Sequence, residues 1–259
     1  MNRKVVDAFI FYNELELLEF RLTELYEVID HFIIVESTKT FVGNEKELFF
    51  DKNRFAKFID KIVYIVVDDF SSNDPWENET RQRNAISEGV AMLDLAETDI
   101  IIISDVDEIP DPDRLLEIKF AKEIFEYYTF HLDFYYYNLT CKFVGYWGWV
   151  KAVTKRYYDA NKCPQHIRNM SIDPTIIWEK GSVVEPGGWH LSYFGGIERI
   201  KNKIQNFSHQ EFNTKEILDE IRIRNRIENR IDLFDREIFY ENVPLDKNQY
   251  LPKNYIMLI

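Results

Sequence analysis

The chain has 259 residues, of which 46% are hydrophobic and 15% aromatic, and its formal net charge is −13. This length and composition support one large folded α/β domain and exclude an intrinsically disordered chain. The negative charge argues against nucleic acid as a partner, because no basic face is available. An anionic ligand would therefore need a metal ion, an arginine or a helix N-terminus beside it.

The N-terminal half alternates apolar runs of strand length with helical patterns. In chain order, the predicted strands are residues 5–12, 31–36, 61–67 and 99–104. Asn13 is expected to cap the first helix, with Glu16 in capping-box position, and residues 78–93 are predicted to form a second helix. Near-continuous apolar strands separated by helices indicate a parallel sheet with helices on both faces.

The second half follows a different pattern. Asp111 fits the cap of a short helix over residues 112–118, which begins with proline. Residues 127–138 alternate apolar and polar side chains, as a half-buried antiparallel strand would. A region rich in glycine and tryptophan follows, and residues 214–234 are predicted to form a long closing helix.

A cluster of carboxylates follows the fourth predicted strand directly, in the segment DIIIISDVDEIPD (99–111). In open α/β sheets, ligands bind beyond the carboxyl ends of the strands, where Asp105 and Asp107 are expected to lie. In extended backbone these two side chains would point to the same side. They could then bind Mg²⁺ or Mn²⁺ that carries a diphosphate. An acidic turn before a proline-started helix is the alternative interpretation.

Three other polar side chains are expected near the same edge of the sheet. Asn13 and Glu36 follow the first and second strands, where a carboxylate could accept hydrogen bonds from a base or a ribose. For Glu36, a solvated loop carboxylate is equally compatible with the sequence. Arg83, in the segment TRQRN, could pair with a phosphate or with an aspartate.

Six segments together resemble glycosyltransferase family 17, the family of the enzymes that add bisecting GlcNAc. They are NELELLEFRL, VEST, RQRNA, DVDEIP, GGWHLSYFGG and NFSHQEFNT, within about residues 5–235. The resemblance implies a GT-A fold, in which a Rossmann-like, mostly parallel sheet is flanked by helices, with a smaller antiparallel acceptor-side portion and a C-terminal helix. Residues 1–259 would then be one domain, with a nucleotide-sugar half (1–110) and an acceptor-side half (111–259).

The resemblance also implies a reaction. The donor would be a UDP-sugar, UDP-GlcNAc in characterised members, and the acceptor a glycan or glycoprotein. A divalent metal, Mn²⁺ or Mg²⁺, would bind at Asp105 and Asp107, and the anomeric carbon would invert. Inversion requires a base for the acceptor hydroxyl. Glu211 is the first candidate for this base and His209 the second, followed by Asp133 and Glu185.

GT-A enzymes commonly complete the metal site with a histidine late in the chain. His190 is favoured over His209 for this role, because it follows glycines that let backbone approach a ligand closely. Trp189 is expected to contact the donor, and Trp147 and Trp149 would either pack on sugar faces or belong to the core. On the last helix, Arg224 is expected to form a buried salt bridge rather than to contact the diphosphate.

Two other functions remain open at this point. A Mg²⁺-dependent phosphohydrolase would use Asp105 as its nucleophile, and a non-catalytic relative would only bind carbohydrate or nucleotide sugar. No apolar run approaches the roughly 18–20 residues that span a bilayer, and the first residues do not resemble a signal peptide. We therefore expect a soluble, cytoplasmic protein, in contrast to the membrane-anchored Golgi enzymes of animals. Cys141 and Cys163 are expected to be reduced.

Overall fold

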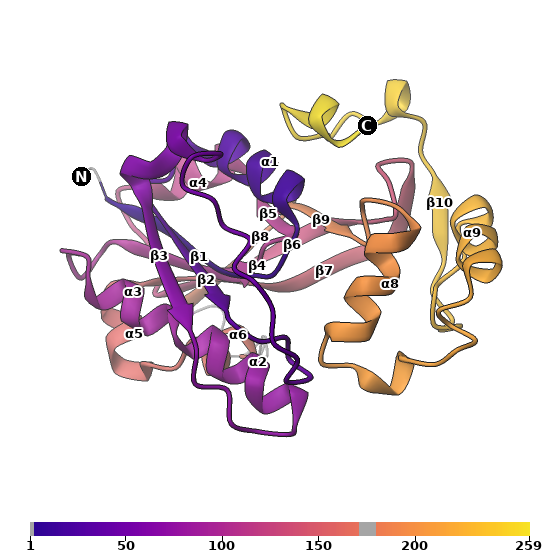
Figure 1. Ribbon diagram of the computed structural model, residues 1–259. Helices are drawn as coiled ribbons and strands as arrows, with labels where there is room; N and C mark the ends of the chain where they lie inside the picture. Colours follow the sequence, from indigo (N-terminus) through magenta and orange to yellow (C-terminus); the bar gives the residue numbers. More distant parts are fainter. Residues whose placement is uncertain (1–2, 171–179) are drawn as a thin grey trace.

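The computed structural model describes residues 3–170 and 180–259 and shows a mixed ten-stranded sheet with helices on both faces (Figure 1). The strands are β1 (Val5–Phe11), β2 (His31–Ser37), β3 (Ile62–Val67), β4 (Ile100–Asp105), β5 (Glu108–Pro110), β6 (Tyr127–Tyr136), β7 (Cys141–Thr154), β8 (Gly181–Val184), β9 (Gly188–Ser192) and β10 (Tyr240–Asn242). Their order is β3-β2-β1-β4-β7-β6-β9-β5, with β8 beside β6 and β10 beside β7.

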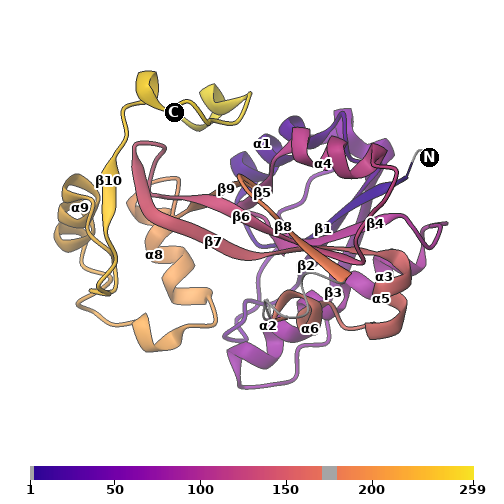
Figure 2. The same cartoon turned by 180° about the vertical axis from the view of Figure 1, so that it is seen from behind.

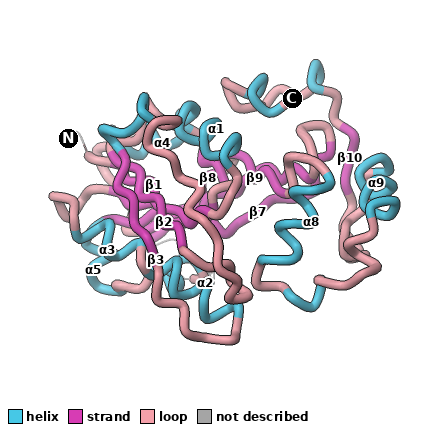
Figure 3. Tube along the Cα trace, viewed as in Figure 1, coloured by secondary structure: helices cyan, strands magenta, loops and turns pink. Residues whose placement is uncertain are grey.

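Six of the eight α-helices in the described residues lie on the two faces of the sheet. These eight helices are α1 (Leu15–Leu25), α2 (Pro75–Asn84), α3 (Ile86–Ala91), α4 (Pro112–Phe120), α5 (Lys155–Asn161), α6 (Pro164–Arg168), α8 (Ile197–Asn206) and α9 (Glu220–Asn229). Helices α1 and α4 cover one face, and α2, α3, α5 and α6 cover the other (Figures 1 and 3). In residues 3–170 and 180–259, no helix is both long and apolar enough to cross a bilayer.

The parallel half of the sheet consists of β3, β2, β1 and β4, and it confirms the four predicted strands. The isoleucine run of β4 shows why these strands are apolar throughout. Ile100 and Ile102 pack into a core cluster with α1 and α4, while Ile101 and Ile103 pack into a second cluster with α3. Because both faces are covered, every isoleucine of the strand is buried. Burial of each of these side chains contributes about 1.5–3 kcal/mol to the stability of the folded protein.

The antiparallel half begins at β7, which pairs with β4 on one side and β6 on the other. The strand predicted over residues 127–138 is confirmed as β6. The expected exposed face is absent, because nearly all side chains of this strand are buried and its buried apolar ones belong to two different core clusters. A third core cluster joins aromatic residues of this half to α8 and α9. Seen from behind, α8, α9 and β10 lie together at the far end of β6 and β7 (Figure 2).

Several element boundaries differ from the predictions. The helix expected over residues 78–93 starts earlier, at Pro75 after the Asp74 cap, and divides into α2 and α3. The closing helix expected over residues 214–234 is only α9, since Arg230 takes a left-handed conformation (φ 54°) that ends it. The chain then continues through β10 and returns to α1, where Glu24 accepts a hydrogen bond from the amide of Asn254 (2.9 Å).

Two predicted caps had different outcomes. Asp111 caps α4 as expected, because its carboxylate accepts a hydrogen bond from the amide of Asp113 (2.8 Å). Asn13 does not cap α1, which begins at Leu15 without a side-chain cap. Both cysteines are free, as predicted.

Candidate active site

A pocket of about 1150 Å³ lies at the carboxyl ends of the parallel strands and extends toward the antiparallel half. The ends of β1, β2 and β4, together with α2 and α6, line one part of it. Strands β6, β7 and β9, helix α8 and the segments after α8 and α9 line other parts. Among the predicted site residues, those that line it are Asp105, Asp107, His190, His209 and Glu211, together with Trp147 and Trp149. The pocket therefore occupies the place where open α/β sheets bind ligands.

The turn between β4 and β5 is held in place by Arg21 of α1, which is completely buried. Its Nη1 donates to the carbonyl oxygens of Asp105 and Glu108, each at 2.7 Å, and its Nη2 donates to the hydroxyl of Ser104 (2.7 Å). Asp7 of β1 balances its charge at 2.6 Å. Arg21 thus fixes the backbone that presents the acidic side chains.

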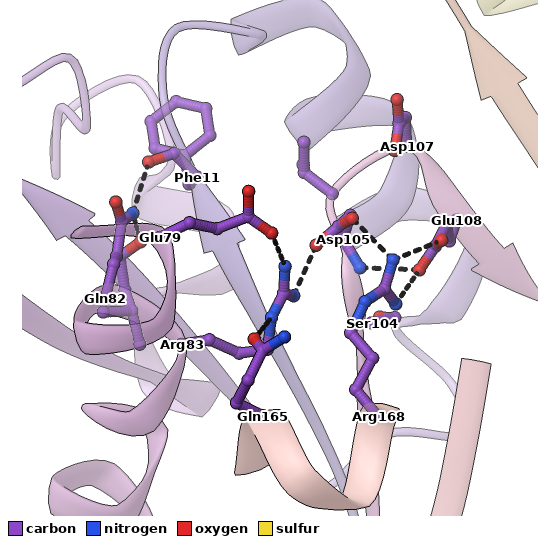
Figure 4. A network of polar contacts seen from close by, with 12 residues as sticks. Phe11, Glu79, Gln82, Arg83, Ser104, Asp105, Asp107, Glu108, Gln165 and Arg168 are labelled. Atoms are coloured by element: carbon purple, nitrogen blue, oxygen red, sulfur yellow. Dashed lines mark hydrogen bonds and ion pairs between the residues drawn. The ribbon is translucent and has the colours of Figure 1, made fainter. Parts of the chain in front are cut away.

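The positive partner of Asp105 is a pair of arginines (Figure 4). Arg83 of α2 contacts one carboxylate oxygen at 2.5 Å, and Arg168 of α6 contacts the other at 2.7 Å. Arg168 also forms a bidentate pair with Glu108 (2.7 and 2.8 Å), and Glu79 accepts from Arg83 (2.7 Å). Burial alone would raise the pKa of Asp105, but Arg168 and Arg83 outweigh it and lower the pKa below its usual range.

Asp107 points away from this arginine network (Figure 4). Lys203 of α8 lies 2.8 Å from its Oδ2, and Nε2 of His190 lies 3.7 Å from its Oδ1. The side chain is only 8% exposed. Burial by itself would raise its pKa, but Lys203, followed by His190, holds the pKa of Asp107 well below its usual range. Asp107 is therefore a carboxylate that stays ionised inside the pocket.

The imidazole of His190 sits between two aromatic rings. It stacks on Phe134 (centroids 4.6 Å apart, 13° between planes) and lies 4.4 Å from Trp147. Strand β9 sets this position, because it pairs His190 with Phe134 on one side and with Glu108 on the other. Among the described residues, its buried Nδ1 has no hydrogen-bond partner. The rings hold the imidazole edge toward Asp107.

The side chains of Asp107 and His190 could coordinate a divalent cation whose remaining coordination positions are filled by a bound substrate. Asp107 and His190 offer one carboxylate and one imidazole on the same side of the pocket. In residues 3–170 and 180–259, no group of three or more histidine, cysteine, aspartate or glutamate side chains is placed to hold a metal. Asp105 does not join the pair, since its oxygens are bonded to arginines. A metal here would need further oxygen ligands, such as those of a diphosphate.

His209 and Glu211 form a second polar pair in the pocket. Nδ1 of His209 lies 2.7 Å from Oε1 of Glu211, and both residues belong to the segment that follows α8. The imidazole packs edge-on against Trp76 of α2 (4.5 Å between centroids). Although partial burial raises it, the pKa of Glu211 is lowered overall by its bond to His209. A histidine oriented by a carboxylate can accept a proton at its other nitrogen.

Four residues predicted to contact the donor do not line the pocket. Asn13 donates to the side chain of Asn202 (2.9 Å), and Arg83 is buried against Asp105. Glu36 is fully buried and accepts hydrogen bonds from Lys46 and from two backbone amides of the following loop. Trp189 stacks on a tyrosine of the C-terminal segment. In the structure these residues lie outside the pocket lining and have other partners.

The remaining candidates also have structural partners. Asp133 pairs with a lysine of β7 (2.7 Å), and Glu185 pairs with His131 (2.9 Å). Trp147 donates from its indole to Glu108, while Trp149 is 45% exposed at the pocket. Arg224 is exposed on α9, so the expectation of a buried salt bridge there was wrong.

Sequence reasoning missed Arg21, Arg168 and Lys203. Only Lys203 carried a usable signal, because it lies between the buried Ile200 and Ile204 at helical spacing and so faces inward on α8. The two arginines reach the acidic turn from helices 84 and 63 residues away in the chain, and no local pattern marks such contacts.

Known proteins that are similar to this chain include two mammalian enzymes. Two relatives are the β-1,4-mannosyl-glycoprotein 4-β-N-acetylglucosaminyltransferases of Rattus norvegicus and Homo sapiens, each 27% identical over 236 residues. The match covers 81% of this chain and 44% of each relative, so the chain spans less than half the length of these proteins.

Two solved structures are similar at 13% sequence identity. The match with S. aureus TarS covers 94% of this chain and 76% of the TarS chain, with a TM-score of 0.38. The match with the glycosyltransferase GlyE of Streptococcus pneumoniae covers 99% of this chain and 60% of the GlyE chain, with a TM-score of 0.36. The sequence pattern that defines glycosyltransferase family 17 matches residues 1–242, which is nearly the whole chain. The chain belongs to glycosyltransferase family 17.

Proposed function

We propose that this protein transfers GlcNAc from UDP-GlcNAc to a hydroxyl of a glycan or glycoprotein, with inversion at the anomeric carbon and with Mn²⁺ or Mg²⁺ as cofactor. Family membership and the printed names of the relatives support the transfer of N-acetylglucosamine. Because the chain spans 44% of those relatives, the proposal depends mainly on the site itself.

One observation carries the proposal: Asp107 and His190 face each other across 3.7 Å, inside a large pocket at the carboxyl ends of the parallel strands. They would hold the divalent ion, which supplies Lewis acidity for the negative charge that develops on the departing UDP. The nucleoside would then lie against the ends of β1 and β2, where Tyr12 and Ser37 line the pocket.

The acceptor side of the pocket supplies the base. The acceptor hydroxyl attacks the anomeric carbon while the bond from that carbon to the diphosphate oxygen breaks, and the electron pair leaves with UDP. The hydroxyl proton goes to Nε2 of His209, whose Nδ1 is oriented by Glu211. The sequence favours Glu211 as the base, but its lowered pKa makes it the weaker proton acceptor. The geometry therefore supports His209 as base and Glu211 as its positioning residue.

The phosphohydrolase alternative finds no support in the geometry. A nucleophilic aspartate needs a carboxylate oxygen that is free to attack phosphorus. Both oxygens of Asp105 are bonded to arginines, one to Arg83 and the other to Arg168.

The decisive experiment measures UDP release from UDP-GlcNAc and other UDP-sugars over a panel of glycan acceptors, with Mn²⁺, with Mg²⁺ and with EDTA. We expect acceptor-dependent release that EDTA abolishes and that UDP-GlcNAc supports best. Equal release in EDTA would refute the metal. Donor binding without turnover on any acceptor would identify a binding protein, and hydrolysis of a simple phosphate ester alone would favour a phosphohydrolase.

A further inference from the structure

Lys203 holds a position in the pocket that the reaction outlined above does not use. Its Nζ lies 2.8 Å from Oδ2 of Asp107 and 5.2 Å from the ring centre of Tyr193. Helix α8 fixes its backbone, because Ile200 and Ile204 on either side are buried in the third core cluster. The side chain is still 32% exposed and lines the pocket, so its ammonium group can move without unpacking the helix.

Lys203 is paired with Asp107 in the structure, within a larger cluster of charges. At the end of β4, four carboxylates (Glu79, Asp105, Asp107 and Glu108) contact three cationic side chains (Arg83, Arg168 and Lys203). The two arginines are bonded to the other three carboxylates. Among the lysines and arginines of the described residues, Lys203 is the one that forms an ion pair with Asp107.

A divalent ion bound between Asp107 and His190 would bring two positive charges close to the ammonium of Lys203. Like charges at such separations repel each other strongly, because the pocket screens them less than bulk water does. The lysine and the ion therefore compete for the same carboxylate. A displaced lysine needs a new anionic partner inside the pocket, and the diphosphate that accompanies the metal is such a partner.

We propose that Lys203 is a displaceable counter-ion. Its ammonium group pairs with the Asp107 carboxylate when no metal is bound. It leaves this carboxylate when the metal binds, and it then binds the diphosphate of the donor. This inference rests on the proposed function of the site. It makes the binding of metal and of donor cooperative, because the donor diphosphate stabilises the lysine that the metal displaces.

The test uses Lys203→Gln, which removes the charge and keeps a hydrogen-bond donor. Binding of Mn²⁺ alone is measured by electron paramagnetic resonance, and binding of UDP in saturating Mn²⁺ by calorimetry. We expect Mn²⁺ alone to bind about fivefold more tightly to the variant, because its competitor is gone. We expect UDP to bind about tenfold more weakly, because one charge-assisted hydrogen bond to the diphosphate is lost.

Lys201→Gln is the matched control, since Lys201 lies on the same helix but pairs with Glu198 and Glu220 outside the pocket. We expect both affinities of this control to equal those of the wild type. If Lys203→Gln leaves the Mn²⁺ affinity unchanged or lowers it, or leaves the UDP affinity unchanged, the inference is wrong while the proposed function stands. If the wild-type protein binds neither Mn²⁺ nor UDP, both fail together.

A second measurement keeps the ion pair intact, in case Lys203→Gln does not fold. Lysines of the wild-type protein are labelled by reductive ¹³C-methylation, and the NMR signal of Lys203 is assigned by its loss in Lys203→Arg. Displacement predicts that this signal shifts when Mg²⁺ is added and shifts again with UDP, while the Lys201 signal stays in place. A Lys203 signal that responds to neither addition would overturn the inference.

Discussion

The two halves of the sheet meet at the pocket, and the two aspartates there have different partners. On the parallel side, each carboxylate oxygen of Asp105 is paired with an arginine, one with Arg83 and the other with Arg168. On the antiparallel side, Asp107 faces His190 on β9 and Lys203 on α8, and the ring of His190 lies between aromatic side chains. Two carboxylates that are two residues apart thus have different sets of partners.

The difference arises in the turn between them. In a continuing strand, both side chains would point the same way. Instead, strand β4 ends at Asp105, a turn covers residues 106–107, and Arg21 binds the carbonyl oxygens on either side. We propose that Asp105 and its arginines stabilise the fold, and that Asp107 takes part in the chemistry of the site. The following predictions test this division.

The largest expected effect is on Asp107. Asp107→Asn removes the ionised carboxylate that would hold the metal, so we expect turnover to fall by at least about 10³-fold. UDP release and circular dichroism measure activity and fold. Asp133→Asn, which alters an aspartate outside the pocket, should keep near wild-type turnover. An active, folded Asp107→Asn protein would show that the two aspartates have been assigned the wrong way round.

The next effect concerns stability on the parallel side. Arg168→Met leaves Asp105 and the buried Glu108 without a shared cation, so we expect a loss of about 3–5 kcal/mol in the free energy of unfolding. Urea denaturation measures it. Arg156→Met, which breaks a surface pair with Glu126, should cost less than about 1 kcal/mol. Similar losses in both variants would mean that the arginine network is not a stabilising core.

A smaller effect separates the two members of the acceptor-side pair. His209→Gln should lower kcat by about 10²-fold, since it removes the base, and Glu211→Gln by about tenfold, since it removes only the group that orients the base. Steady-state kinetics measure kcat for both variants, and the affinity for UDP is measured as a check that the donor site is intact. A larger loss in Glu211→Gln than in His209→Gln would exchange the two roles.

The smallest expected effect is a change in stability at Lys151, on the strand β7 that joins the antiparallel half of the sheet to β4. Burial, followed by the nearby Arg168, lowers the pKa of Lys151 on β7 to about 8 from its usual 10.5. The folded protein therefore binds fewer protons than the unfolded chain between these values, and its stability rises with pH across that window. Below pH 8 the full penalty for the buried charge applies.

Lys151→Met removes that penalty together with one hydrogen bond to the carbonyl of Gly148. We expect it to be more stable than the wild type by about 1–2 kcal/mol at pH 7, with the difference shrinking toward pH 10.5. Urea titrations at several pH values measure this. A difference that does not change with pH would contradict the lowered pKa.

Local sequence patterns alone are enough to predict the parallel half of the sheet, and they indicate the edge of the sheet at which to expect a ligand site. The apolar runs that become β1 to β4 carry their own signal, because strands buried on both faces are apolar at every position. The carboxyl ends of such strands form one edge, and this rule alone is enough to predict a ligand site at Asp105 and Asp107. His190, His209 and Glu211 were found through the family resemblance, and all three line the pocket.

Only the tertiary structure decided what each acidic residue contacts. Arg21, Arg168 and Lys203 come from three helices that are far apart in the chain, and the packing of those helices on the sheet places their charges beside the turn. Glu36 and Trp189, in contrast, do not line the pocket. Hydrophobic periodicity reports burial of a segment along its own length, whereas ion pairing depends on which distant segments meet, and that information is not present in any local stretch of sequence.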